Sequence, residues 1–140
     1  MLFHFLPLTQ TTAMFDLVEN ATSTALINEF YASNLLVSAV CHGSAALLNV
    51  RLPNGHLLIH GHRVTGFSNA EEIAVDRQKD MPFHLETALD EASGGGYEKA
   101  VKAWDPWVVV SEIEGKRLLT GQNPGSARGL AEEVLKALLK

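Results

Sequence analysis

Hydrophobic positions recur with a helical spacing in several parts of the chain. Residues 19–34 predict a helix that Asn20 or Thr22 can cap and Asn34 can end. Its apolar stripe consists of Leu26, Ile27, Phe30 and Tyr31.

Residues 67–76 predict a second helix with Ser68 or Asn69 as its cap. Residues 82–92 predict a third, with Pro82 in its first turn and Gly94–Gly96 as its stop. Residues 123–140 predict a closing helix whose apolar face is made of Leu130, Val134, Leu135, Leu138 and Leu139.

Shorter apolar runs between these segments indicate strands. Residues 35–40, "LLVSAV", are typical of a strand that is buried on both faces, and the small residues of "GSAALLNV" begin a helix directly after it. Residues 56–67 predict a small hairpin that turns near Gly61. Residues 107–121 predict a second hairpin around Glu114-Gly115.

Helices that alternate with short strands predict an α/β fold with a parallel sheet. Only one strand is clearly of the fully buried kind, whereas a doubly wound sheet needs several. The pattern therefore indicates part of a larger α/β domain.

Composition narrows the class of protein. The 140 residues are 46% hydrophobic and 19% charged, with a net charge of −5, so no basic field is expected to attract nucleic acid or an anionic membrane. One cysteine excludes an internal disulfide and a multi-cysteine zinc site. The apolar start lacks a basic region and contains Pro7, which is unlike a signal peptide, and no run is long enough to span a bilayer. We therefore expect a cytoplasmic protein.

The single cysteine lies at the corner between the predicted buried strand and the helix after it. Such a corner projects Cys41 from the carboxyl end of the strand, and a helix N-terminus there would lower the pKa of its thiol. The adjacent His42 can act as a base, and its backbone N–H can donate to an oxyanion, while Gly43 allows the tight turn. Glu71 and Glu72 are both candidates for the carboxylate that orients His42. The alternative is a buried structural cysteine beside a histidine by chance.

Three ordered motifs carry a family resemblance. They are "AVCHGSAALLNV", "VTGFSNAEE" and "LLTGQNPGSA". Together they resemble the PfpI-like branch of the class I glutamine amidotransferase-like superfamily, and within it the glyoxalase III and heat-shock chaperone group, of which the Parkinson-associated deglycase is a more distant relative. The resemblance runs from about Met14 to the end of the chain.

The resemblance implies a flavodoxin-like α/β sandwich with helices on both faces. It also implies glutathione-independent conversion of methylglyoxal to D-lactate, with Cys41 as nucleophile, His42 as its partner and Glu72, better placed than Glu71, as the third member. It implies no metal or organic cofactor. Deglycase and holdase chaperone activities are also described for such proteins.

The chain departs from the family pattern before Met14. Family members carry several βα units, an acidic residue beside the cysteine and a Gly-Gly-His-Gly loop upstream, whereas "LPLTQTTA" precedes "MFDLVENA" here. We therefore divide the chain into a non-family segment, residues 1–13, and a partial family domain, residues 14–140. This departure predicts weakened glyoxalase activity, and it leaves a homodimer open as a way to cover the sheet.

Other side chains suggest sites of their own. His56, His60 and His62 alternate and could share one face of a strand as a divalent metal patch, although surface histidines of a hairpin explain them equally simply. The loop "TGQNPGSA" lacks the lysine and glycine spacing of a phosphate loop and is explained as a helix cap close to the catalytic side. Trp104 and Trp107 are interpreted as core or interface aromatics.

Two functional hypotheses besides the enzyme remain open at this point. One is a stress-related holdase or interaction protein that binds clients through exposed apolar surface. The other is a cysteine redox sensor, which requires an exposed thiol of low pKa.

Overall fold

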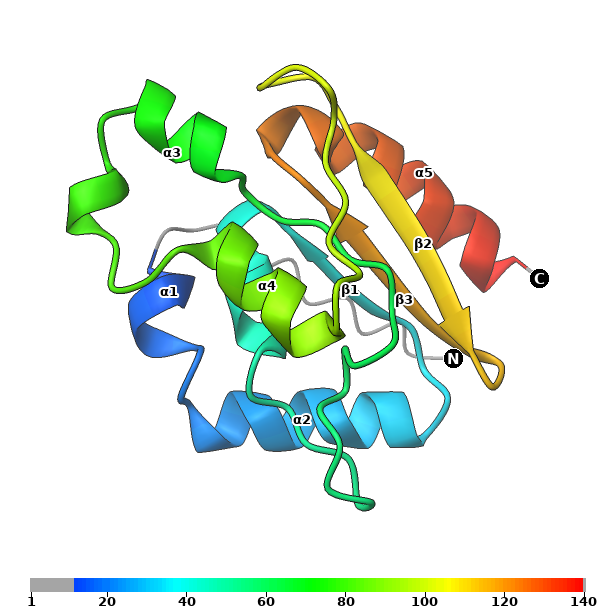
Figure 1. Ribbon diagram of the computed structural model, residues 1–140. Coiled ribbons are helices and arrows are strands. Elements are labelled where there is room, and N and C mark those ends of the chain that lie inside the picture. The colour runs from blue at the N-terminus through cyan, green and yellow to red at the C-terminus, as the bar shows by residue number, and fades with distance from the viewer. Residues whose placement is uncertain (1–11, 140) are drawn as a thin grey trace.

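The structure, a computed structural model, describes residues 12–139 (Figure 1). Its helices and strands in chain order are α1 (Ala13–Asp16), α2 (Ala21–Ala32), β1 (Val37–Val40), the 3-10 helix η1 (Cys41–Leu47), α3 (Asn69–Ala74), η2 (Gln78–Asp80), α4 (Leu85–Ser93), β2 (Val108–Ile113), β3 (Lys116–Gly121), η3 (Pro124–Ser126) and α5 (Ala127–Leu138). Most of the segment 1–13 that the sequence sets apart lies outside the described residues.

The three strands form one sheet in the order β1-β3-β2. β1 and β3 are parallel, with Val40 opposite Gly121, whereas β2 and β3 are antiparallel, with Val108 opposite Gly121. The sheet is therefore mixed, with the parallel pairing that the α/β pattern predicts between β1 and β3 and an antiparallel pairing within the predicted hairpin. The predicted hairpin around Glu114-Gly115 is confirmed, and it joins β2 to the sheet.

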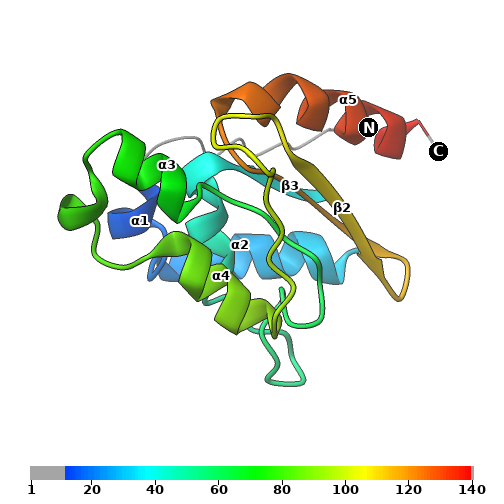
Figure 2. The same ribbon diagram turned by 45° about the horizontal axis from the view of Figure 1, so that its top comes forward.

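Helices cover both faces of this sheet, as the sequence predicts. α5 packs over β3 on one face, while α2, α4 and η1 lie on the other (Figure 2). α5 buries Leu130, Val134 and Ala137, which follow the helical repeat. Leu135 stays 58% exposed, so the predicted apolar face of this helix is too wide. The narrower buried stripe is enough to hold α5 on a sheet of three strands.

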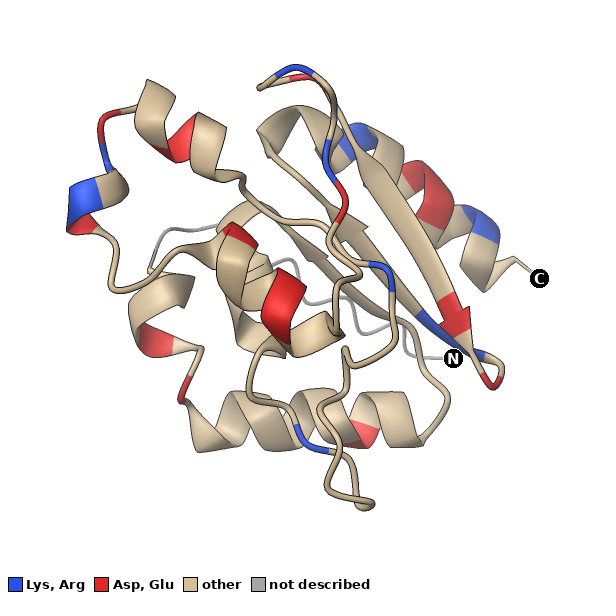
Figure 3. Cartoon of the chain, in the orientation of Figure 1, with Lys and Arg blue, Asp and Glu red and all other residues tan. Residues whose placement is uncertain are grey.

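Most of the predicted helix ends are found where the sequence places them. The Asn20 side chain accepts from the backbone of Ser23 and caps α2, and Gly94 ends α4 with a left-handed backbone. Pro82 is not in the first turn of α4, which begins at Leu85. Among residues 12–139 we find no helix with the length and hydropathy that a membrane span requires. Basic residues are scattered over separate elements rather than gathered on one face (Figure 3).

The hairpin predicted for residues 56–67 does not form. A turn does occur at Gly61, but Val64 forms an isolated parallel bridge with Tyr97 instead of pairing with the residues before the turn. His62 explains the difference, because its ring is buried between Tyr31 and Ser111 and draws the chain into the core. The segment therefore forms an ordered loop that leads to α3, and Gly61 N in it donates to Ser93 O at the end of α4.

Candidate active site at the ends of β1 and β3

The carboxyl ends of β1 and β3 meet at the same edge of the sheet because the two strands are parallel. Cys41 follows β1 and Gln122 follows β3, while the antiparallel strand β2 begins at this edge. Ligand sites of open α/β sheets form at such an edge. The topology therefore brings Cys41 beside both ends of the hairpin of β2 and β3, which is distant in sequence.

Cys41 occupies a strained corner at this edge. Its φ is 59°, in the left-handed region that residues with a side chain rarely adopt. The preceding Val40 is extended, and the 3-10 helix η1 begins at Cys41 itself. Gly43 is buried in that helix, so the sharp strand-to-helix turn inferred from the sequence is confirmed, although a 3-10 helix replaces the expected α-helix.

His42 connects the thiol to a carboxylate. Its Nδ1 lies 3.4 Å from Cys41 Sγ, and its Nε2 contacts Glu72 Oε1. An ionised carboxylate only accepts hydrogen bonds, so Nε2 carries the proton and the lone pair of Nδ1 faces the thiol. Of the two candidate glutamates, Glu72 is the one whose side chain contacts His42.

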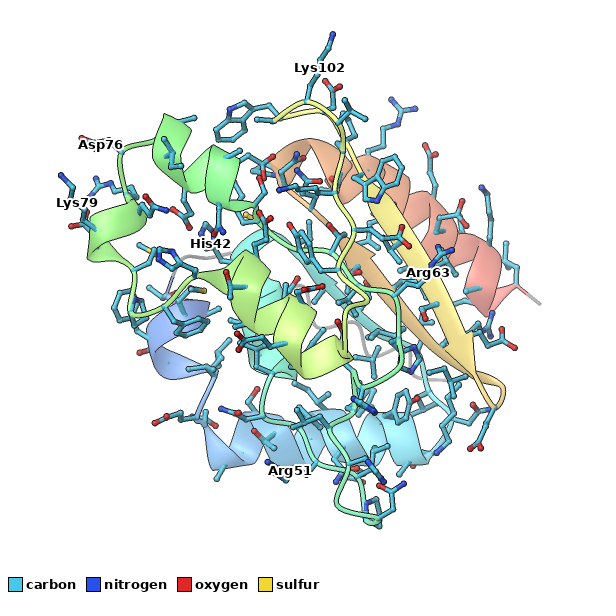
Figure 4. All side chains as sticks on the ribbon, in the orientation of Figure 1. His42, Arg51, Arg63, Asp76, Lys79 and Lys102 are labelled. Carbon is cyan, nitrogen blue, oxygen red and sulfur yellow. The ribbon has the colours of Figure 1, made fainter. Side chains whose placement is uncertain are left out.

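The start of α3 aims Glu72 at this histidine. Ser68 and Glu71 form a capping box, in which the Ser68 side chain accepts from the Glu71 backbone and the Glu71 side chain accepts from the Ser68 backbone. Figure 4 shows His42 at the end of the molecule where α3 lies. The His42 ring also packs on Phe67, with ring centroids 4.4 Å apart. The cap and this stacking fix both ends of the hydrogen bond between His42 and Glu72.

The pKa of the Cys41 thiol differs from the sequence-based expectation. Burial raises this pKa to about 12, with smaller contributions from the negative charges of Glu71 and Glu72, against a backbone hydrogen bond from His42 that lowers it. Cys41 is only 6% exposed. The short 3-10 helix does not outweigh the loss of solvent, so the prediction of a lowered thiol pKa is wrong for this structure.

A pocket of about 540 Å³ opens onto the thiol. Its walls combine the three site residues with a mainly apolar set of side chains. The lining consists of Cys41, His42, Phe67, Glu72, Val75, Arg77, Met81, Trp104 and Pro124. Pro124 belongs to the "TGQNPGSA" loop, so the expected position of that loop on the catalytic side is confirmed, and the Asn123 side chain caps η3 as predicted.

Glu71 is a residue whose role the sequence did not reveal. It is fully buried and accepts hydrogen bonds from Ser68, Trp104, Gln122 and Asn123. Burial raises the pKa of its carboxyl, but the hydrogen bonds from Ser68, Asn123 and Gln122 outweigh burial and leave the pKa below its usual value. The capping-box pattern from Ser68 to Glu71 was the available signal, but it gives no information about the distant donors.

The histidine patch does not assemble. His56 and His60 stack with centroids 6.0 Å apart, whereas His62 turns inward to Tyr31 and Ser111. Within the described part of the chain, no group of three or more His, Cys, Asp or Glu side chains is placed to hold a metal ion. The alternative reading of surface histidines is also wrong for His62, which is buried. Trp104 is 45% exposed and lines the pocket, so it is not a core aromatic.

Comparison with known proteins identifies relatives of the chain. No protein-family model matches it. A glutathione-independent glyoxalase of Schizosaccharomyces pombe is 31% identical over 129 residues, which are 90% of this chain and 53% of the relative. Glyoxalase 3 of Candida albicans is 32% identical over 128 residues, 89% of this chain and 52% of the relative. The chain thus spans about half the length of the curated relatives it matches.

Comparison with solved structures also finds proteins with a similar fold. The rapid encystment protein of Francisella tularensis superposes with a TM-score of 0.82 at 38% identity, over 91% of this chain and 54% of that one. Candida albicans glyoxalase III gives 0.78 at 30% identity, over 89% and 52%. A two-domain protein of Anabaena variabilis with a DJ-1/ThiJ/PfpI-like domain shares the fold, with a TM-score of 0.52. The flavodoxin-like fold implied by the resemblance is confirmed, and the chain is similar to glutathione-independent glyoxalases over about half of their length.

Proposed function

We propose that this chain carries the nucleophilic site of a glutathione-independent glyoxalase that converts methylglyoxal to D-lactate. The observation that carries the proposal is the continuous contact from Cys41 through His42 to Glu72 at the pocket wall. The names of the relatives supply the reaction class. In this proposal residues 14–140 are the family domain that performs the chemistry.

The arrangement gives each residue a role. The thiol is neutral at rest because burial raises its pKa, so its proton must leave as the new bond forms. The lone pair of His42 Nδ1 faces Cys41 Sγ and takes this proton, while Glu72 stabilises the imidazolium. The sulfur adds to the aldehyde carbon and gives a hemithioacetal, whose oxygen accepts from the backbone N–H of His42, the residue before Gly43.

The remaining steps balance without a cofactor. The base removes the proton of the former aldehyde carbon while the neighbouring carbonyl oxygen gains a proton, which gives an enediol. Return of a proton to the second carbon and loss of the hydroxyl proton on the first carbon then give the thioester. Water then cleaves the thioester, releases lactate and returns the thiol. His42 is the base that contacts Cys41 among the described residues, so both proton transfers fall to one imidazole. Because one imidazole must perform both proton transfers, we expect low glyoxalase activity.

A lactate assay with purified full chain tests the proposal. We expect D-lactate from methylglyoxal, no product from Cys41→Ala, and a loss of about 10²–10⁴-fold in kcat for His42→Ala, since general base catalysis contributes that much. Glu98→Gln is the control, because Glu98 pairs with Arg63 outside the pocket.

Absence of D-lactate, or unchanged turnover in Cys41→Ala, would refute the proposal. A holdase function stays a separate prediction, for which client binding would survive Cys41→Ala. The sensor hypothesis loses its physical basis, because a buried thiol of raised pKa is a poor target for oxidants.

A further inference from the structure

We infer that Glu71 is a positioning residue that fastens the Trp104 wall of the pocket to the helix bearing Glu72. The inference rests on the proposed function and deepens it, because Glu71 would shape the substrate pocket through Trp104 although, among the described residues, it makes no hydrogen bond to Cys41 or His42. The two carboxylate oxygens of Glu71 accept hydrogen bonds from different parts of the chain.

One oxygen serves its own helix. Oε2 accepts from the Ser68 backbone N at 2.9 Å and from Ser68 Oγ at 2.7 Å. These two contacts complete the cap of α3 and hold the turn from which Glu72 projects. They involve no residue outside the helix start.

The other oxygen serves segments that are distant in sequence. Oε1 accepts from Trp104 N at 3.1 Å, Gln122 Nε2 at 3.0 Å and Asn123 Nδ2 at 2.7 Å. Gln122 in turn accepts from Ala100 N at 2.8 Å, and Asn123 Nδ2 also donates to Asp105 O at 2.9 Å, so the segment before β2 is held on both sides of Trp104. All five contacts to Glu71 come from donors, which an ionised carboxylate alone can satisfy fully.

Trp104 shows why such fastening is needed. Its φ is 72°, which is a strained backbone for a bulky residue and persists only where the surroundings enforce it. Its ring packs edge-on against Phe67, with centroids 5.6 Å apart, and Phe67 stacks on His42. The Glu71 contact to the Trp104 backbone therefore holds an aromatic wall in register with the reacting groups.

Glu71→Gln separates the cap of α3 from the contacts to Trp104, Gln122 and Asn123. A glutamine at this position still supports a capping box, because its carbonyl oxygen can accept from Ser68. Its NH₂ group would then face the N–H groups of Trp104, Gln122 and Asn123, which are donors as well. The variant thus retains the helix cap and Glu72 while it releases the Trp104 wall.

The experiment measures methylglyoxal turnover and fluorescence quenching by acrylamide in a Trp107→Phe background, where Trp104 is the sole tryptophan. For Glu71→Gln we expect KM to rise about tenfold with kcat within about twofold, the pattern of lost uniform binding. We also expect Trp104 to become more accessible to acrylamide. Glu86→Gln is the matched control, since Glu86 accepts from Asn69 at the same helix but touches none of the three donors.

A merely structural role would reduce kcat together with the folded fraction and leave KM unchanged, and that result would overturn the inference. Unchanged quenching of Trp104 would overturn it as well. If Glu71→Gln fails to fold, Gln122→Met removes one donor and should move KM and quenching in the same direction. If the wild-type chain makes no lactate, the proposed function fails, and the quenching comparison still decides whether Glu71 holds Trp104.

Discussion

At the scale of single residues, the state of the Cys41 thiol is set by burial rather than by the helix that follows it. Its raised pKa of about 12 predicts slow alkylation by iodoacetamide near neutral pH. The native rate should rise only well above pH 8.5, whereas in denaturant the midpoint should return to about 8.5. Because the chain has one cysteine, the readout reports Cys41 alone. A native midpoint below the denatured one would show that the thiolate is stabilised instead.

The sequence singled out Cys41, His42 and Glu72 as candidates but did not predict their environment. Adjacent glutamates on a helix point about 100° apart, so Glu71 and Glu72 necessarily take different partners, and motif spacing favoured Glu72 for His42. Which way the Cys41 pKa moves depends on how deeply the thiol is buried and on the negative charges of Glu71 and Glu72. These groups come from segments that the sequence does not show to be neighbours.

At the scale of secondary structure elements, β3 organises the fold. It lies between β1 and β2, and its successive residues Leu118 and Leu119 are both completely buried although they point to opposite faces. Leu119→Ala should therefore lower the free energy of unfolding by about 2–5 kcal/mol. Denaturant titration monitored by circular dichroism measures this change. Val110→Ala is the control, because Val110 lies opposite Leu119 on β2 and is 41% exposed.

For Val110→Ala we expect a change of less than about 1 kcal/mol, as is usual for surface substitutions. Equal losses in the two variants would contradict the central position of β3. The slope of the titration should be the same in both variants and in the wild type, since neither substitution alters the surface exposed on unfolding.

The two hairpin predictions show where element-level inference succeeds and fails. Residues 107–121 place apolar runs on both sides of a Glu-Gly turn whose two residues both have positive φ, so local chemistry is enough to predict this hairpin. Residues 56–67 have a comparable pattern, but His62 finds its partners in α2 and β2 rather than across the turn. The two long-range hydrogen bonds of His62 thus prevent the hairpin that the local sequence pattern predicts. Nothing in the sequence near His62 indicates these distant partners.

At the scale of the whole molecule, His62 joins parts of the chain that are distant in sequence. Its Nε2 lies 2.8 Å from the Tyr31 hydroxyl on α2, and its Nδ1 lies 2.8 Å from Ser111 Oγ on β2. The Arg63 backbone N–H also donates to Ser111, so the Ser111 hydroxyl proton is free to go to His62. A neutral imidazole, one donor and one acceptor, satisfies this chain of contacts completely.

Burial lowers the pKa of His62, and this direction sets the pH dependence of stability. The unfolded chain protonates its histidine near pH 6.5, whereas the folded chain does so only at lower pH. The stability that depends on neutral His62 is therefore fully present above pH 6.5 and is lost as the pH falls through the lower, folded pKa. The free energy of unfolding should decrease by about 1.4 kcal/mol for each unit that separates the two pKa values.

Urea titrations between pH 7.5 and 4.5 measure this slope. His62→Gln should be less stable than the wild type at pH 7.5, because it replaces a ring that bridges α2 and β2, but its stability should fall less as the pH decreases. His60→Gln is the matched control, since His60 is exposed and its loss should leave the wild-type slope intact. A His62→Gln slope equal to that of the wild type would mean that other groups govern the acid response. In that case the junction between α2 and β2 would stabilise the fold without responding to pH.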